Sequence, residues 1–201
     1  MGSMSAKNEV LFVTGNSHKV KEANRVLSRF GITVKMVECE KVEIQSESLT
    51  RIAKYAASLA AKKLGKPVIV EDSGLFVKAL DGFPGPFSSY VFKTVGCGGV
   101  LQLMSGITDR RAVFKCAVAF CSPGSHLLAF EGKAYGSISS SVRGSGGFGF
   151  DPIFVPKNGD GRTFAEMPPE GKDRLSHRGA AFRALGEWYA KSQRALNREL
   201  P

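Results

Sequence analysis

The sequence predicts an α/β fold in which helices pack against the faces of one sheet. In the first half of the chain, short apolar runs alternate with longer segments whose apolar residues recur at helical spacing. This alternation of strands and helices is typical of α/β proteins. In the second half, two β-prone runs flank a Pro-Gly turn, which predicts a hairpin. No linker separates the halves, so we expect one domain of two lobes over residues 7–195.

Local signals define the elements of the first half. The apolar residues of Val20–Phe30 share one helical face, and Gly31 ends the pattern. Ser48 is the expected N-cap of a second, longer helix. In order, we expect a strand at Val10–Val13, a helix at Lys19–Phe30, a strand at Ile32–Val37, a helix from Ser48 to about Leu64 and a strand at Val68–Val70.

The second half of the chain has shorter elements and more loops. Gly82–Pro86 is expected to form a rigid loop, and Gly144–Gly149 a glycine-rich one. The last helix carries its aromatic residues on one side, which predicts that this side packs in the core. The other expected elements are helical pieces at Tyr90–Val95 and Gly99–Met104, strands at Ala112–Phe120, Leu127–Tyr135 and Ile153–Val155, and a helix at about Gly179–Gln193.

The composition indicates a chain that can bury a sizeable core, because 43% of its 201 residues are hydrophobic. The formal charge of +10 favours a polyanionic partner, such as a nucleotide, a nucleic acid or a membrane surface. The basic residues are spread along the chain, which argues against a charged tail. No apolar stretch approaches the roughly 20 residues of a membrane span. Residues 1–4 resemble an expression scar and are excluded from the fold prediction.

The cysteines do not indicate a metal site or a disulfide framework. Cys39, Cys97, Cys116 and Cys121 form no CxxC pair, and no histidines accompany them at zinc-binding spacing. We therefore expect reduced thiols in a cytoplasmic protein.

A polar stretch joins the first predicted strand to the first predicted helix. It consists of Thr14, Gly15, Asn16, Ser17, His18 and Lys19. A tight turn at a helix start presents backbone N–H groups and the positive end of the helix dipole, which favour a bound phosphate. Lys19 lies in the first helical turn, where its ammonium could reach the same anion. The alternative is an ordinary connection with a solvated lysine.

Acidic residues follow the strand predicted at Val68–Val70. Glu71 and Asp72 precede a Ser73-Gly74 pair, and carboxylates at the end of a parallel strand face the crevice where α/β proteins bind ligands. Glu43 lies in a short polar segment before the second helix. Carboxylate oxygens suit Mg²⁺, which usually takes one or two of them together with waters and substrate phosphates. The alternative is that these acids form salt bridges or are solvated.

The glycine-rich loop delivers two aromatic residues beside a carboxylate. It contains the pattern GxGxxG, but Asp151-Pro152 prevents a helix from starting there, which excludes a dinucleotide-binding turn. The same two residues break any match to an RNA-binding strand. Phe148 and Phe150 could stack on a base, and Asp151 could accept from a purine N–H. The alternative is that both phenylalanines belong to the core.

A cluster of hydrogen-bond donors precedes the last predicted helix. Lys172, Arg174, His177 and Arg178 surround Ser176, the expected N-cap. Donors at a helix start suit recognition of a phosphate or a base edge, whereas the alternative is a surface charge cluster. The chain has no GxxxxGK[ST] motif, no GxSxG and no HExxH, which argues against a P-loop NTPase and the enzymes that use the other two motifs.

Short motifs occur in a fixed order between residues 14 and 178. They are Thr14-Gly15-Asn16-x-x-Lys19, Glu43-x-Gln45, Val70–Gly74, Phe83-Pro84-Gly85 with Ser88, Gly147–Pro152, Phe164–Met167, Lys172 and Ser176-His177-Arg178. Each is modestly specific, but the whole series in this order is highly specific. In this series the chain resembles the inosine triphosphate pyrophosphatase family, also called the Ham1-like family.

The resemblance implies a long central mixed sheet with two lobes around a nucleotide cleft, and a homodimer. It also implies Mg²⁺-dependent hydrolysis of ITP, dITP and XTP to the monophosphate and pyrophosphate, which clears deaminated purines from the nucleotide pool. A stable nucleic-acid or membrane partner is not expected.

The resemblance also implies roles for individual residues. The triphosphate would be held by Thr14, Gly15, Asn16, Ser17, His18 and Lys19. Glu43 and Asp72 would bind Mg²⁺, Asp72 would also accept the proton of the attacking water, and Ser73 would touch the substrate. The base would be sandwiched and read by Phe148, Gly149, Phe150 and Asp151. Lys172 would help to bind the substrate, and His177 and Arg178 would contact its 6-oxo edge.

The chain departs from the family pattern in two places. Many members carry a substrate-contacting lysine on the second helix, and an ungapped match puts Ala56 there. Phe87 stands where tyrosine is common in the family. Phe150 stands where tyrosine or tryptophan is common. The lost hydroxyl groups could alter base or ribose preference without abolishing hydrolysis.

Two other functions remain alternatives for these motifs. A nucleic-acid-binding module would use the basic surface with Phe148 and Phe150, and would not need the carboxylates. A related pyrophosphatase for modified pyrimidines, similar to the Maf-like proteins, would share the chemistry. The Ser176–Arg178 segment favours a 6-oxo purine over a pyrimidine.

Overall fold

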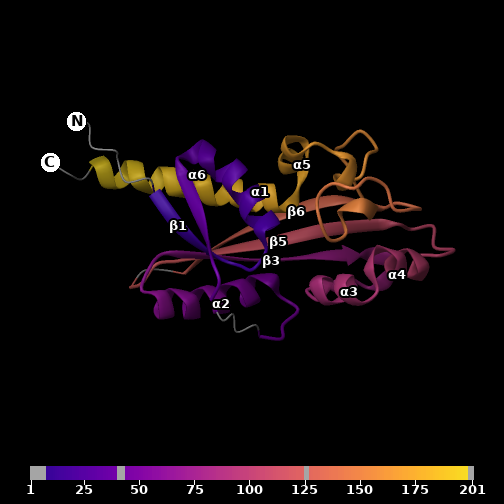
Figure 1. The fold of residues 1–201 in the computed structure, drawn as a ribbon, viewed down its shortest axis with the longest axis horizontal. Helices are drawn as coiled ribbons and strands as arrows, with labels where there is room; N and C mark the ends of the chain where they lie inside the picture. Colours follow the sequence, from indigo (N-terminus) through magenta and orange to yellow (C-terminus); the bar gives the residue numbers. More distant parts are fainter. Residues whose placement is uncertain (1–7, 40–43, 125–126, 199–201) are drawn as a thin grey trace.

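The computed structural model describes residues 8–39, 44–124 and 127–198 (Figure 1). Its strands are β1 (Asn8–Val13), β2 (Ile32–Val37), β3 (Val68–Val77), β4 (Pro84–Gly85), β5 (Arg111–Cys121), β6 (Leu128–Ile138) and β7 (Phe154–Pro156). Its α-helices are α1 (Ser17–Leu27), α2 (Leu49–Leu64), α3 (Ser88–Thr94), α4 (Gly96–Leu103), α5 (Pro169–Leu175) and α6 (His177–Arg198). Helices flank the strands, so the predicted α/β class is confirmed.

The described strands form one seven-stranded mixed sheet in the order β2-β1-β3-β5-β6-β7, with β4 paired to β3. β1 runs parallel to β2 and, at Leu11 and Phe12, to the start of β3. β3, β5 and β6 are antiparallel and much longer than β1. In Figure 1 these long strands run from the region of α2 toward that of α3 and α4, so the same sheet packs against both groups of helices.

Helices cover both faces of the sheet (Figure 1). α1 and α6 pack against one face, where Ile69, Val118 and Phe182 are buried together. α2 packs against the other face, where its alanines meet Val70 and Ala117. We call these the α6 face and the α2 face. A third cluster, which contains residues of α3 and α4, fills the far end of the sheet.

β3 is longer than the sequence predicted. The sequence predicts a strand at Val68–Val70 with acids at its end, whereas the strand continues to Val77. It continues because β5 pairs with all of its residues. Gly74 marks a close approach within the strand, since a Cβ there would collide with the carbonyl oxygen of Gly85 in β4. Glu71 and Asp72 therefore lie inside a long strand.

Most other predicted elements are confirmed with shifted ends. Ser48 caps α2 as predicted, because its Oγ accepts from the N–H of Arg51 at 3.3 Å. Ser176 caps α6, accepting from the N–H of Gly179 at 3.0 Å, so this helix begins earlier than predicted. α5 was not predicted, because its seven residues include a proline and a glycine.

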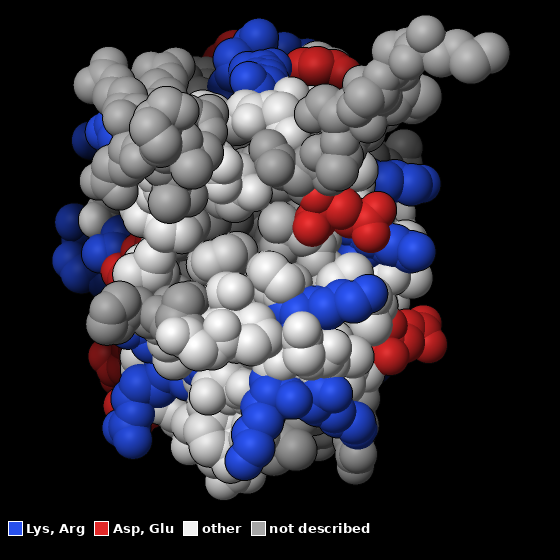
Figure 2. All heavy atoms as spheres, turned by 90° about the vertical axis from the view of Figure 1, so that its left-hand side faces the viewer, with Lys and Arg blue, Asp and Glu red and all other residues white. Residues whose placement is uncertain are grey.

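Basic side chains occur at several separate places on the surface. Figure 2 shows one end of the molecule, on which Lys and Arg side chains lie at separate places with Asp and Glu between some of them. Lys62 and Lys63 lie in the last turn of α2, where cations interact favourably with the helix dipole. Among the described helices, none is long and apolar enough to cross a membrane.

Candidate active site

β3 carries two neighbouring carboxylates that lie on opposite faces of the sheet, because successive side chains on a strand alternate. Glu71 accepts from Arg178 at the start of α6 and so lies on the α6 face. Asp72 is two residues after Val70 on the strand, so the two side chains point to the same face. Val70 packs under α2, and Asp72 therefore lies on the α2 face. Glu71 is 2% exposed, whereas Asp72 is half-buried. The two acids therefore meet different surroundings.

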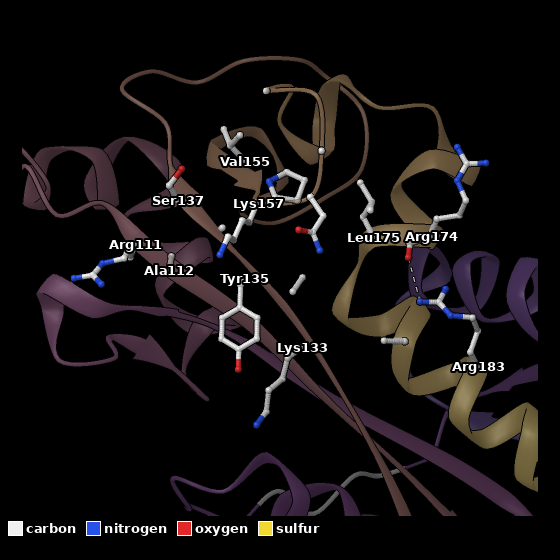
Figure 3. A pocket seen from close by; sticks show the side chains of 17 residues that line it. Arg111, Ala112, Lys133, Tyr135, Ser137, Val155, Lys157, Arg174, Leu175 and Arg183 are labelled. Atoms are coloured by element: carbon white, nitrogen blue, oxygen red, sulfur yellow. Dashed lines mark hydrogen bonds between the residues drawn. The ribbon is translucent and has the colours of Figure 1, made fainter.

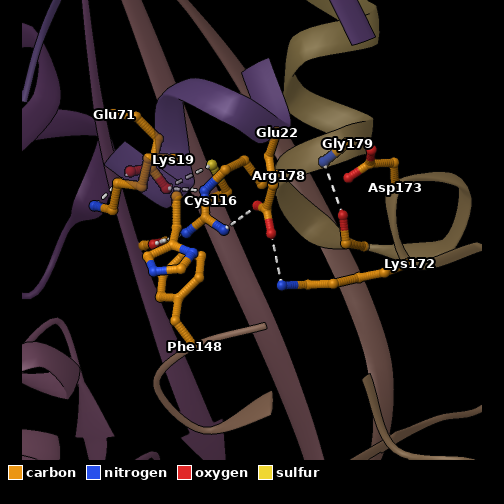
Figure 4. A network of polar contacts seen from close by, with 12 residues as sticks. Lys19, Glu22, Glu71, Cys116, Phe148, Lys172, Asp173, Arg178 and Gly179 are labelled. Carbon is orange, nitrogen blue, oxygen red and sulfur yellow. Dashed lines mark hydrogen bonds and ion pairs between the residues drawn. The ribbon is translucent and has the colours of Figure 1, made fainter. Parts of the chain in front are cut away.

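On the α6 face, acids and bases form a buried network that joins distant parts of the chain (Figure 4). The Arg178 guanidinium donates to Glu71 at 3.0 Å and to Glu22 at 2.7 Å. Lys172 Nζ donates to Glu22 and to Asp151, each at 2.6 Å. All five side chains are at most 5% exposed. Charges buried to this degree are tolerated because each has a partner.

The cations keep Glu71 and Glu22 of this network ionised. Burial opposes ionisation of Glu71, but the charges of Arg178 and of Lys19, which is 2.6 Å away, hold its pKa well below 4.5. Burial also opposes ionisation of Glu22, yet Arg178 and Lys172 lower its pKa to about 2. Removing one partner of such a pair strands a buried charge, which makes the network sensitive to substitution.

The Phe148 ring lies over two cations of this network. The ring centroid is 4.9 Å from Lys172 Nζ and 5.0 Å from the guanidinium carbon of Arg178. Lys172 commits two of its three N–H donors, to Glu22 and Asp151. Arg178 commits three of its five, the third of them to Ser73. Three N–H groups therefore remain without a partner among the described residues.

The segment between β1 and α1 is folded by its own side chains. Thr14 Oγ1 accepts from the N–H of Asn16 at 3.1 Å, and Asn16 Oδ1 accepts from those of His18 and Lys19 at 2.9 and 3.4 Å. The exposed residues are Gly15, Ser17 and His18. The His18 ring lies 5.4 Å from that of Phe148. The expected phosphate-binding turn and the glycine-rich loop are thus neighbours.

Asp151 holds the glycine-rich loop in place. Its carboxylate accepts from the N–H of Phe148 at 2.7 Å, in addition to its pair with Lys172. Gly147 has φ +68°, and a Cβ there would collide with this carboxylate. Both contacts use Oδ2 of Asp151 and position the Phe148 ring, and the expected acceptance from a purine N–H stays a prediction.

Phe150 lies in the core and not beside Phe148. The sequence predicts that both rings flank a base, whereas Phe150 is 3% exposed and packs edge-on against Phe92 at 5.4 Å. Phe148 is only half-buried. The loop turns between the two residues, with φ +62° at Gly149, and sends one ring to each side. The alternative prediction of a core phenylalanine thus holds for Phe150, and only Phe148 offers a ring to a base.

His177 is a buried, neutral ring at the start of α6. It stacks on Phe114, with ring centroids 4.5 Å apart and planes 7° apart. Burial, assisted by the charge of Arg178, lowers its pKa well below 6.5. Its Nδ1 finds no hydrogen-bond partner among the described residues. This nitrogen is therefore available to a ligand or a water molecule.

The predicted metal ligands are only partly described. Asp72 is half-buried on the α2 face, and Glu43 lies outside the described residues. Within the described ranges, no group of three or more His, Cys, Asp or Glu side chains could hold a metal ion. Any metal at Asp72 would therefore need ligands beyond the described side chains.

A cavity of about 870 Å³ opens elsewhere, beside β6, β7 and α6 (Figure 3). Its cations are Arg111, Lys133, Lys157, Arg174 and Arg183, and no carboxylate lines it. Neither Asp72 nor a member of the buried network lies there. Hydrolysis by water is helped by a group that accepts a proton, so this cavity is a poor candidate for the reaction site.

Glu22 is a network residue that the sequence analysis missed. It is 5% exposed and lies on the same side of α1 as the buried Ala23, Val26 and Leu27. A charged residue on the apolar side of an amphipathic helix signals a buried ion pair. Cys116 also joins the network, 3.3 Å from Glu71, but its sequence context offers no such signal.

Comparison with known proteins agrees with this fold and these motifs. A family model described as the Ham1 family matches residues 10–188. The "dITP/XTP pyrophosphatase" of Methanopyrus kandleri is 49% identical over 90% of this chain and 96% of its own, and that of Hyperthermus butylicus 48% identical over 89% and 93%. A HAM1 protein structure from Coxiella burnetii superposes with a TM-score of 0.80 at 30% identity, covering 91% of this chain and 98% of its own. The Staphylococcus aureus Ham1 protein gives a TM-score of 0.79 at 28% identity, covering 92% and 99%. The chain therefore belongs to the Ham1 family.

Proposed function

We propose that this protein is a nucleoside triphosphate pyrophosphohydrolase that converts XTP, dITP and ITP to the monophosphate and pyrophosphate. The relatives named dITP/XTP pyrophosphatase support the reaction and the first two substrates. ITP carries the same base as dITP, so it presents the same groups to a pocket that reads the base. In the cell, this activity would remove deaminated purines from the nucleotide pool.

The observation that carries the proposal is the set of three uncommitted N–H donors on Lys172 and Arg178, beside the Phe148 ring. Fixed donors next to an aromatic ring suit a flat base whose edge carries oxo groups. A 6-amino group, as in ATP, offers no acceptor to these donors. Each buried donor left unpaired costs about 1–3 kcal/mol, so a few such contacts produce large selectivity.

We assign the proton acceptor role to Asp72. Water is a poor nucleophile, and transfer of its proton to a nearby base assists its attack on a phosphorus atom. Glu71 is unsuited to this role, because Arg178 and Lys19 hold it as a paired anion. Asp72 is half-buried on the other face and adjoins Ser73, whose hydroxyl accepts from Arg178 at 3.0 Å. The reaction cleaves the bond between the α- and β-phosphates and releases pyrophosphate.

The carboxylate oxygens of the chain are suitable ligands for Mg²⁺. This ion takes one or two carboxylates and completes its shell with water and phosphate oxygens, so it does not need a three-residue cluster. Asp72 would hold it, together with Glu43 from outside the described residues. Bound there, Mg²⁺ would supply positive charge that neutralises the phosphate chain. The segment from Thr14 to Lys19 would orient that chain at the start of α1, where the helix dipole favours an anion.

We also propose a homodimer in a reducing cytoplasm. Exposed aromatic side chains near α3 support self-association: Phe83, Phe87 and Tyr90 are 41%, 52% and 70% exposed. The four cysteines are free, as a reducing compartment requires. Light scattering on the purified protein tests the dimer, and a monomer mass would contradict it.

The first test is pyrophosphate release with Mg²⁺, comparing XTP, dITP and ITP with ATP and GTP. We expect fast turnover of the first three and at least tenfold slower turnover of ATP. GTP tests whether an amino group at the 2-position is also rejected. Equal turnover of all five would contradict the donor argument but keep the reaction. No turnover of any of them by the folded protein would contradict the proposed function.

A further inference from the structure

The α2 face carries a lysine that the functional site has not accounted for. Lys115 of β5 pairs with Gly74 of β3, and Asp72 pairs with Ala117, so Lys115 is the diagonal neighbour of Asp72. Diagonal neighbours on one face of an antiparallel pair lie about 7–8 Å apart, within reach of a long side chain. Ala117 packs under α2, which fixes the face to which Lys115 belongs.

Lys115 is a half-buried cation without an ion-pair partner among the described carboxylates. Its Nζ lies 4.1 Å from the centre of the Phe76 ring. An aromatic ring attracts an ammonium group but does not neutralise it. By contrast, Lys19 pairs with Glu71, and Lys172 pairs with both Glu22 and Asp151. Of these lysines, Lys115 is the one whose charge is not already matched.

A cavity of about 200 Å³ lies in front of this ammonium. Phe76, Lys115 and Ala117 line it, together with the first turn of α2. It is large enough for about six water molecules. Glu47, Glu131 and Lys133 also line it, and Glu131 Oε1 accepts from the hydroxyl of Thr50 at 2.5 Å. The cavity therefore adjoins Lys115, the diagonal neighbour of Asp72.

None of the buried residues of α2 is a cation. Its buried residues are Leu49, Ile52, Ala53, Ala56, Ala57, Ala60 and Ala61, all of them apolar. A nucleoside triphosphate carries several negative charges, and more charge develops on the departing pyrophosphate as the bond breaks. A positive group on the face of Asp72 is therefore needed, and β5 provides it.

We propose that Lys115 contacts the β- and γ-phosphates of the substrate, forming a subsite for the leaving pyrophosphate on the α2 face. This inference rests on the proposed function. Lys115 leaves Phe76 and donates to phosphate oxygens, while Asp72, beside it, receives the proton of the attacking water. Lys115 thus serves the leaving group, whereas Lys172 and Arg178 serve the base on the other face.

The test compares Lys115→Met and Lys115→Arg with wild type, using Lys62→Met as the control that removes one exposed positive charge. A hydrogen bond from a charged group to phosphate corresponds to about 10- to 100-fold in affinity. We expect Lys115→Met to lower kcat/KM for XTP by that factor, and Lys115→Arg to recover most of it. Lys62→Met should behave as wild type. Changes within twofold in Lys115→Met would overturn the inference.

Calorimetry separates this subsite from the proposed function. Magnesium pyrophosphate should bind Lys115→Met about 10- to 100-fold more weakly than wild type, whereas the monophosphate XMP, which lacks the leaving phosphates, should bind both equally. Equal loss of both ligands would overturn the inference. If wild type releases no pyrophosphate from any nucleotide, the proposed function fails, yet pyrophosphate binding still decides the role of Lys115.

Discussion

The two faces of β3 handle charge in opposite ways. On the α6 face, Glu71 is fully buried and its charge is matched by Arg178 and Lys19. On the α2 face, Asp72 is half-buried, and the nearby Lys115 rests on an aromatic ring. A buried network of matched charges keeps its donors in place, whereas a carboxylate on a half-buried residue is closer to solvent. Adjacent acids thus acquire different roles from the alternation of one strand.

The largest expected effect is the loss of a central charge from the α6 face. Arg178→Met removes the guanidinium that Glu22 and Glu71 share and leaves each buried acid with one lysine partner, and breaking a buried ion pair costs about 3–5 kcal/mol. Urea denaturation should show that loss in the free energy of unfolding. The control, Arg111→Met, removes an exposed guanidinium paired with Asp109 and should leave the midpoint nearly unchanged. Equal midpoints for both variants would contradict the described network.

The next effect depends on pH and isolates His177. Burial holds its folded pKa well below 6.5, so the unfolded chain binds a proton in a range where the folded protein does not. Stability is therefore lost as pH falls below 6.5 towards the folded pKa. As pH falls from 7.5 to 5.5, protonation of this residue in the unfolded chain should lower the free energy of unfolding by about 1.4 kcal/mol. His177→Asn, which cannot titrate, should lose that much less over the same interval.

Chemical denaturation at the two pH values measures this difference directly. The change in unfolding free energy between the two pH values matters more than the absolute stability of the variant, because Asn also changes packing against Phe114. If wild type and His177→Asn lose the same free energy between pH 7.5 and 5.5, His177 is not the buried neutral ring described.

The smallest effect concerns the α2 face, where Ser48 is the N-cap of α2. Ser48→Ala removes the acceptor for the N–H of Arg51 and should cost about 1 kcal/mol at any pH. Ser48→Asp keeps an acceptor and should retain most of the stability. A pH-dependent loss in Ser48→Ala, measured by thermal denaturation, would show that titrating groups also couple to the α2 face.

Local signals predicted most of the fold. The caps at Ser48 and Ser176 mark the starts of α2 and α6, and the Pro-Gly turn predicted the β5–β6 hairpin. The continuation of β3 was missed because Ser73-Gly74 is typical of a turn. Only the distant β5 makes the extended conformation favourable there, and a local pattern carries no information about a partner strand.

The sequence predicted many residues of the candidate site but not the contacts between them. Order along the chain identified Lys172, Arg178 and Asp151 as neighbours of a ligand, but not that they bond to one another through Glu22. Whether Phe148 or Phe150 faces a ligand depends on how a glycine loop turns, which is set by tertiary contacts. Glu43 lies outside the described residues, so its role remains a prediction.

The most direct test of the division between the two faces compares Asp72→Asn with Glu71→Gln, measuring XTP turnover and unfolding free energy for each. Asp72→Asn should lower kcat by about 10²- to 10⁴-fold while the stability stays close to that of wild type. Asp160→Asn, an exposed carboxylate paired with Arg162, is the matched control and should change neither quantity.

Glu71→Gln should instead lower the free energy of unfolding by about 3–5 kcal/mol, because Arg178 and Lys19 lose their shared counter-charge. That pair of results would support one acid for the reaction and one for the structure. Turnover of Asp72→Asn within tenfold of wild type, or Glu71→Gln with unchanged stability, would contradict it.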